Sequence, residues 1–173
     1  MKKTVLKYLA ILFTSITIVS CSDDDDPIVI NEEETITTVK LTVTETGTTT
    51  STEYTWTTDD QDPITLQANT TYNVSIEFLD ESDPNNVEDI TAEVIAEADE
   101  HFVFYETTVS GLTYVSAMND TEDTNNIGIN ISTMWTTGDV GTGIIRAYLI
   151  HEPTTKVGTA RADFGGETDI QVE

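Results

Sequence analysis

The chain has 173 residues, of which 32 are acidic and only seven are basic, so its formal net charge at pH 7 is −25. Such a chain repels nucleic acid and anionic lipid, and we expect no nucleic-acid partner. A single cysteine excludes an internal disulfide framework, so the fold must depend on a hydrophobic core.

Residues 1–20 have the layout of a secretory signal peptide. Three lysines precede an apolar run over residues 8–19, which is too short to span a membrane comfortably. Ile18, Val19 and Ser20 then lead directly into Cys21. An aliphatic residue and a small residue before cysteine resemble the bacterial lipobox, at which signal peptidase II cuts and the thiol receives a diacylglycerol. We therefore predict lipidation at Cys21; the alternative is an ordinary signal peptide with a chance cysteine.

An acidic run follows the cysteine: Ser22, Asp23, Asp24, Asp25 and Asp26. This run resembles the lipoprotein export signal of Bacteroidota, which sends lipoproteins to the outer face of the outer membrane. It also suits a solvated tether, because neighbouring like charges repel and keep the chain extended. We predict that residues 21–33 form an acidic lipidated tether, and that the protein is anchored in the outer membrane facing the cell exterior.

Residues 34–173 are expected to form a single domain with its own core. Apolar and polar residues alternate over 39–43, 72–78 and 127–131, and more briefly over 54–56, 64–66, 112–114 and 170–172. Alternation with a period of two is typical of strands with one buried and one wet face. Two stretches, 101–105 and 143–151, are apolar on both faces, which predicts central strands.

One segment departs from this alternation. Residues 87–101 place Ile90, Val94 and Ala98 four residues apart, which predicts a short amphipathic helix with Asn86 as its cap. Many short strands with one helix predict a mainly β fold, an antiparallel β-sandwich of generally immunoglobulin-like character. The alternative is a closed β-barrel.

Five stretches of the domain carry a family resemblance: EETITTVKLTVT (33–44), VEDITAEVIAEADEHFVFY (87–105), MWTTGDVGTG (134–143), RAYLIHEPTTK (146–156) and GGETDIQVE (165–173). From about residue 33 onward the chain resembles a group of small, uncharacterised flavobacterial surface lipoproteins. These are often labelled "type 1 periplasmic binding fold". That fold has two doubly wound α/β lobes and roughly twice this length, so the strand alternation predicts the sandwich instead. The resemblance implies location and broad type, and no reaction.

The sequence contains no catalytic motif of the G-x-S-x-G, P-loop or H-E-x-x-H kind. We expect no catalytic residues and a non-enzymatic binding or accessory module. The favoured function is uptake of a metal, haem or another nutrient beside a TonB-dependent transporter. The alternatives are a structural or adhesive surface domain, and a glycan-binding lipoprotein that uses Tyr54, Trp56, Tyr114 or Trp135. Trp135 is expected in the core, in phase with the apolar residues of 127–131.

His101 and His151 are the only histidines. His101 comes four residues after Glu97, so the two side chains could share a helical face, and His151 ends the apolar stretch 143–151. Imidazole is the commonest side-chain ligand of zinc, copper and haem iron, and a carboxylate can complete such a site. His101, His151 and Glu97 are therefore candidate ligands of a transition metal or haem. The alternative is that His101 stabilises the helix C-terminus as a cation and His151 is structural.

Calcium is a second candidate cofactor, because it takes six to eight oxygen ligands. Two acidic loops supply carboxylates: Asp59, Asp60 and Asp62 in one, and Asp120, Glu122 and Asp123 in the other. Neither matches the spacing of a known calcium loop, so plain solvated loops are the favoured interpretation.

Overall fold

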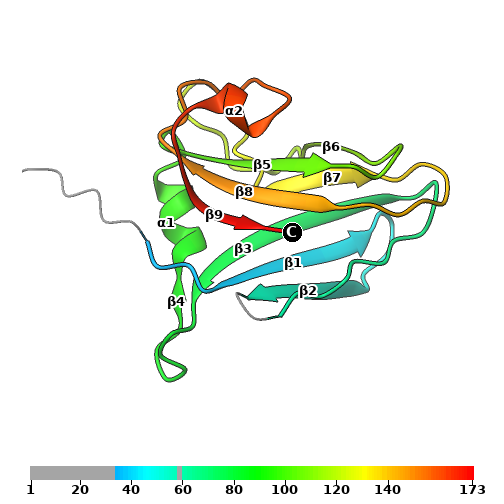
Figure 1. Ribbon diagram of the computed structural model, residues 1–173, viewed down its shortest axis with the longest axis horizontal. Coiled ribbons are helices and arrows are strands. Elements are labelled where there is room, and N and C mark those ends of the chain that lie inside the picture. The colour runs from blue at the N-terminus through cyan, green and yellow to red at the C-terminus, as the bar shows by residue number, and fades with distance from the viewer. Residues whose placement is uncertain (1–33, 58–59) are drawn as a thin grey trace, which may run out of the picture. The chain divides into compact units, whose positions relative to one another are not determined.

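The computed structural model describes residues 34–57 and 60–173, which is all of the predicted 34–173 domain except residues 58 and 59. The first sheet contains β1 (Thr38–Glu45), β2 (Ser51–Thr57), β3 (Thr71–Asp80), β6 (Thr113–Ser116) and β7 (Ser132–Thr136) in the order β2-β1-β3-β7-β6, with the short β4 (Glu88–Asp89) paired to β3. The second sheet has β5 (His101–Thr107), β8 (Ile145–His151) and β9 (Glu167–Val172) in the order β5-β8-β9 (Figure 1).

All strand pairs are antiparallel, and the sheets do not close into a barrel. Strands account for 43% of the structure and helices for 8%, so the predicted mainly β sandwich is confirmed and the barrel alternative is wrong. No helix in the described part of the chain is long and apolar enough to cross a membrane.

The core lies between the two sheets. The inward residues of β1 and β3 are those of the predicted alternation, and Val39, Leu41 and Ile76 have no solvent exposure. The second sheet contributes Val103 and Leu149, which are equally buried. Burial of these aliphatic side chains is the main stabilising term for a domain without an internal disulfide.

Strands β5 and β8 are buried on both faces because α2 (Arg161–Phe164) covers their outer side. Phe164 of α2 packs against Phe102 and Phe104 of β5, with ring centroids 5.2 and 4.7 Å apart. β8 is the central strand, as the apolar stretch predicted. β5, in contrast, ends the strand order, so its apolar outer face reflects the cover from α2 and not a central position.

The predicted helix over 87–101 is shorter in the structure. α1 covers Ile90–Ala96, and Asp89 replaces Asn86 as the N-cap because Glu88 and Asp89 pair with the end of β3 instead. Ile90 and Val94 are buried as predicted.

Two predicted strands are irregular. Residues 64–66 form a loop, and 127–131 run between the sheets: the Ile76 amide donates to the Ile131 carbonyl and the Val103 amide to the Ile129 carbonyl, at 3.0 and 2.9 Å. Asn130 has a φ of 66° in this segment. The backbone carbonyls of this segment accept hydrogen bonds from amides of both sheets. Its apolar and polar side chains therefore alternate although it does not form a regular strand.

Candidate metal centre

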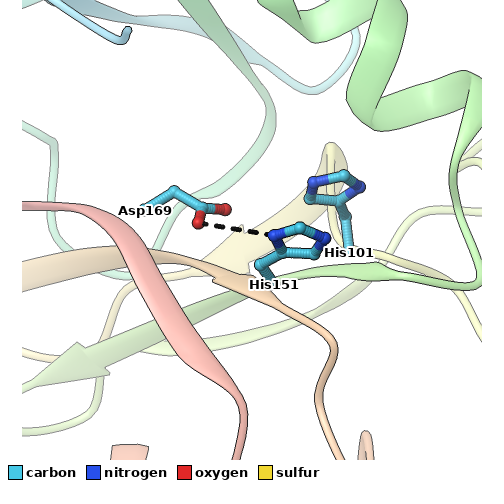
Figure 2. Close-up of side chains that lie close together, drawn as sticks. All are labelled: His101, His151 and Asp169. Atoms are coloured by element: carbon cyan, nitrogen blue, oxygen red, sulfur yellow. Dashed lines mark ion pairs between the residues drawn. The ribbon is translucent and has the colours of Figure 1, made fainter. Parts of the chain in front are cut away.

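The two histidines lie side by side. His101 begins β5 and His151 ends β8, and the antiparallel register pairs them directly. Both share the inward parity of Val103 and Leu149, so their rings point into the sandwich. The ring centroids are 4.8 Å apart with an interplanar angle of 11°, and Figure 2 shows one ring stacked over the other. Nothing in the sequence alone placed them together; the pairing register does.

Asp169 joins the pair because of a β-bulge. Ile170 pairs with Leu149 but Thr168 pairs with Ile150, so Asp169 is an extra residue in β9. A bulge re-aims the side chain of its extra residue. Asp169 Oδ1 lies 3.9 Å from His151 Nδ1, and the Asp169 side chain is only 3% exposed. Alternation around Ile170 would have placed this carboxylate on the solvent face.

Gly166 allows β9 to begin close to the end of β8. Its φ is +61°, a conformation that favours glycine, and a Cβ there would collide with the carbonyl oxygens of His151 and Glu152. The turn at Gly165–Gly166 therefore has a role in the site: it fixes the approach of β9 to His151.

His101 is fully buried and has one ring nitrogen already engaged. Its Nδ1 lies 3.2 Å from the carbonyl oxygen of Glu97, and since a carbonyl only accepts, Nδ1 must carry the proton. The other nitrogen, Nε2, has no hydrogen-bond partner among the described residues. It lies 3.9 Å from Oε1 of Glu34, whose side chain is 9% exposed and whose Oε2 is also buried without a hydrogen-bond partner. A neutral His101 therefore directs a free lone pair toward Glu34.

Carboxylates surround the pair at similar distances. Besides Asp169 and Glu34, Glu100 Oε2 lies 3.9 Å from His151 Nε2 and Glu97 Oε2 lies 4.0 Å from His101 Nδ1. These separations exceed hydrogen-bond distances of about 2.7–3.2 Å. One ligand atom each from His101, His151 and Asp169 lies within 4.8 Å of the other two.

Positive charge beside the site would offset the cost of burying the Glu34 carboxylate. The four basic side chains of residues 34–173 form contacts elsewhere: Lys40 with Glu81, Arg146 with Glu106 and Glu173, Lys156 with Asp123, and Arg161 with the carbonyls of Gly165 and Gly166. A protonated imidazole or a bound metal ion would supply that charge.

The predicted ligands His101, His151 and Glu97 thus lie close together. The Glu97 carboxylate, however, faces Nδ1 of His101, which is already hydrogen-bonded to the backbone carbonyl of Glu97. Sequence reasoning missed Asp169 and Glu34. Asp169 depends on a register shift that alternation does not reveal. Glu34 precedes β1 by a few residues, and only the three-dimensional arrangement brings it to β5.

Four of the calcium candidates accept hydrogen bonds from backbone amides. Asp120 accepts hydrogen bonds from the amides of Asn130 and Ser132, and Asp123 accepts from Ile127 and from Lys156. In the first loop, Asp60 and Asp62 accept from the amides of Gln61 and Thr55. Three groups among the described residues have metal-ligand spacing, and they contain neither these four nor Glu122. Asp59 lies outside the described residues, as do Cys21 and the acidic run 22–26.

The aromatic side chains considered for glycan stacking are mostly core residues. Trp135 is 1% exposed, as expected, and Trp56 is 4% exposed. Tyr54 and Tyr114 are partly buried, and their hydroxyls bond to the backbone of Thr65 and Tyr105. The two tryptophans are therefore core residues, and the two tyrosine rings are half-buried against the core.

A cleft of about 530 Å³ lies at the other end of β8, where Ile145 is part of its wall. Residues 61–68 and 137–145 form most of the lining, and no histidine contributes. The histidine cluster is therefore separate from this cleft.

Comparison of the chain with protein-family models, enzyme families included, with curated proteins and with solved structures found no match in any of the three.

Proposed function

We propose that this protein is a non-enzymatic capture module for a divalent transition-metal ion, held at the outer membrane by a lipid anchor at Cys21. The observation that carries the proposal is the buried pair of imidazoles with carboxylates beside both rings. His101, His151 and Asp169 are the core of the ligand set.

The separation of His151 and Asp169 is closer to that of two ligands of one ion than to that of a direct hydrogen bond. Two donors about 2.0–2.2 Å from one zinc ion lie roughly 3.4 Å apart at a tetrahedral angle. The observed separation of 3.9 Å between His151 Nδ1 and Asp169 Oδ1 requires an adjustment of only about 0.5 Å to reach it. The hydrogen bond from His101 Nδ1 to the Glu97 carbonyl also has the form found behind metal-binding histidines, where it fixes the tautomer and the ring.

The donor types favour a transition metal over the other cofactors considered. Calcium takes oxygen ligands, whereas imidazole suits zinc, copper, nickel and iron. Haem would need an accessible imidazole nitrogen and space for a large ring, but the His101 side chain is 0% and the His151 side chain 6% exposed. A single ion needs far less room.

The outer-membrane location and a role beside a TonB-dependent transporter rest on the lipobox-like residues before Cys21, the following aspartates and the family resemblance. We expect Cys21→Ala to move the protein from the membrane fraction to the soluble fraction of its cells, because the variant has no thiol to acylate. A matched control, Ser22→Ala, should stay in the membrane. Retention of Cys21→Ala in the membrane would contradict the anchor.

Calorimetric titration of zinc into the full mature chain tests the metal proposal. We expect zinc to bind with a stoichiometry of one, and calcium and magnesium at the same concentrations to give only weak, salt-sensitive heats from the acidic surface. Zinc binding that is indistinguishable from calcium binding would mean that the surface carboxylates, and not the histidines, attract the ion.

A further inference from the structure

We propose that Glu34 is a ligand of the same metal ion, and that loading separates the stacked rings and fastens the chain segment before β1 to the β5-β8-β9 sheet. This inference rests on the proposed function and adds to it a fourth ligand and a conformational consequence.

The stacked arrangement cannot itself hold one ion through both histidines. The lone pair of an imidazole nitrogen lies in the plane of its ring, so a metal must lie close to that plane. Two rings stacked at an interplanar angle of 11° have nearly parallel planes that do not meet near either nitrogen. At least one ring must therefore turn when an ion binds to both.

His151 is the ring that can turn more easily. His101 is fixed by the bond from Nδ1 to the Glu97 carbonyl and is completely buried. Both ring nitrogens of His151 face carboxylates only at 3.9 Å, beyond hydrogen-bond distance. We therefore infer that His101 keeps its position and supplies Nε2, while His151 rotates toward the ion.

Glu34 is already placed for that Nε2. Its carboxylate is nine-tenths buried, one oxygen lies 3.9 Å from His101 Nε2, and the other has no hydrogen-bond partner among the described residues. A buried acceptor without a partner is costly, and a metal ion between Glu34 and His101 would remove that cost.

The four proposed ligands come from different parts of the fold, so an ion that binds all of them would join those parts. His101, His151 and Asp169 belong to β5, β8 and β9, whereas Glu34 lies four residues before β1 of the other sheet. Thr37, whose amide donates to the Leu79 carbonyl, ties this lead-in segment to the first sheet. An ion that also binds Glu34 would cross-link the two sheets through the segment that precedes β1, in a chain whose single cysteine allows no internal disulfide.

The test compares Glu34→Gln with Glu97→Gln in the full mature chain, using zinc alone as the probe. Both changes remove one carboxylate near His101, but Glu97 is 45% exposed and faces the engaged Nδ1. We expect zinc affinity, measured by competition with a chromophoric chelator, to fall on the order of 10–100-fold in Glu34→Gln and to change less than about 3-fold in Glu97→Gln. Hydrogen exchange of the amides of residues 35–37 should slow on zinc addition in wild type and in Glu97→Gln only.

The outcomes separate the two proposals. If wild type binds zinc and Glu34→Gln binds it equally well with unchanged exchange at 35–37, the role of Glu34 is wrong and the metal site stands on its other ligands. If wild type binds no zinc, both proposals fail. A loss of affinity in Glu34→Gln together with loss of the exchange protection supports the cross-link.

Discussion

Replacing Lys156 by methionine is expected to lower the free energy of unfolding by about 3 kcal/mol, the lower end of the range for breaking a buried ion pair. Lys156 Nζ lies 3.0 Å from Asp123 Oδ2 and 2.6 Å from the carbonyl oxygen of Ala98, and the two charged side chains are 5% and 4% exposed. Methionine has a similar length but leaves the Asp123 carboxylate without its cation. Urea denaturation at pH 7 measures the effect.

Lys40→Met is the matched control. Lys40 and Glu81 form a pair at 3.4 Å, with side chains 26% and 36% exposed, and such surface pairs contribute about 0–1 kcal/mol. Adding Asp123→Asn to Lys156→Met should recover part of the loss, because the amide removes the unpaired charge and keeps an acceptor oxygen for the amides of Asn125 and Ile127. A loss no larger than that of Lys40→Met would contradict the account of this pair.

The effect should also depend on pH. Burial by itself raises the pKa of Asp123, but the Ile127 amide, the Lys156 ammonium and the Asn125 amide outweigh it and hold that pKa below its usual value. The stabilisation is therefore fully present above the unfolded pKa, about 3.9, and is lost as the pH falls through the lower folded value. The difference between wild type and Lys156→Met should accordingly shrink below about pH 4.

The sequence predicted the parts of the fold that depend on local alternation. The inward residues of β1 and β3 and the buried face of α1 were all found where the period of their apolar residues placed them. What it missed depends on pairing between distant segments: the β4 pairing that shortens α1, the crossing segment 129–131, and the α2 cover that buries the outer face of β5.

The same distinction holds for the candidate site. Residue chemistry indicated His101 and His151, but their contact follows from the register of β5 and β8, which are separated by about forty residues of other structure. Asp169 was hidden by the bulge, since the alternation of Ile170 with its neighbours predicts the opposite face. Glu34 carries no local signal, because its partner belongs to the other sheet.

The second large effect concerns the histidine pair. In His101→Phe/His151→Phe, we expect the zinc dissociation constant to rise on the order of 100-fold or more, because two ligands are lost. Even the loss of a residue that only hydrogen-bonds to a metal ligand lowers metal affinity by about 10–100-fold. Phenylalanine keeps an aromatic ring at each position, so stacking and core volume are largely preserved. Far-ultraviolet circular dichroism and a denaturation curve verify that the variant is folded.

Single variants refine this expectation. His151→Phe removes the ring inferred to rotate and should weaken zinc binding strongly. Thr44→Val, at a half-buried position of β1 in the other sheet, loses the hydroxyl that bonds Ser51 and should leave zinc binding unchanged. Equal loss in Thr44→Val would indicate a general effect of the substitutions rather than removal of ligands.

The most direct test of the metal site is calorimetric titration of zinc into wild type and into the folded His101→Phe/His151→Phe variant, side by side in the same buffer. We expect one saturable site in the wild type and no saturable site in the variant over the same concentration range. Equal zinc binding by both proteins would contradict it and would make the two histidines structural residues.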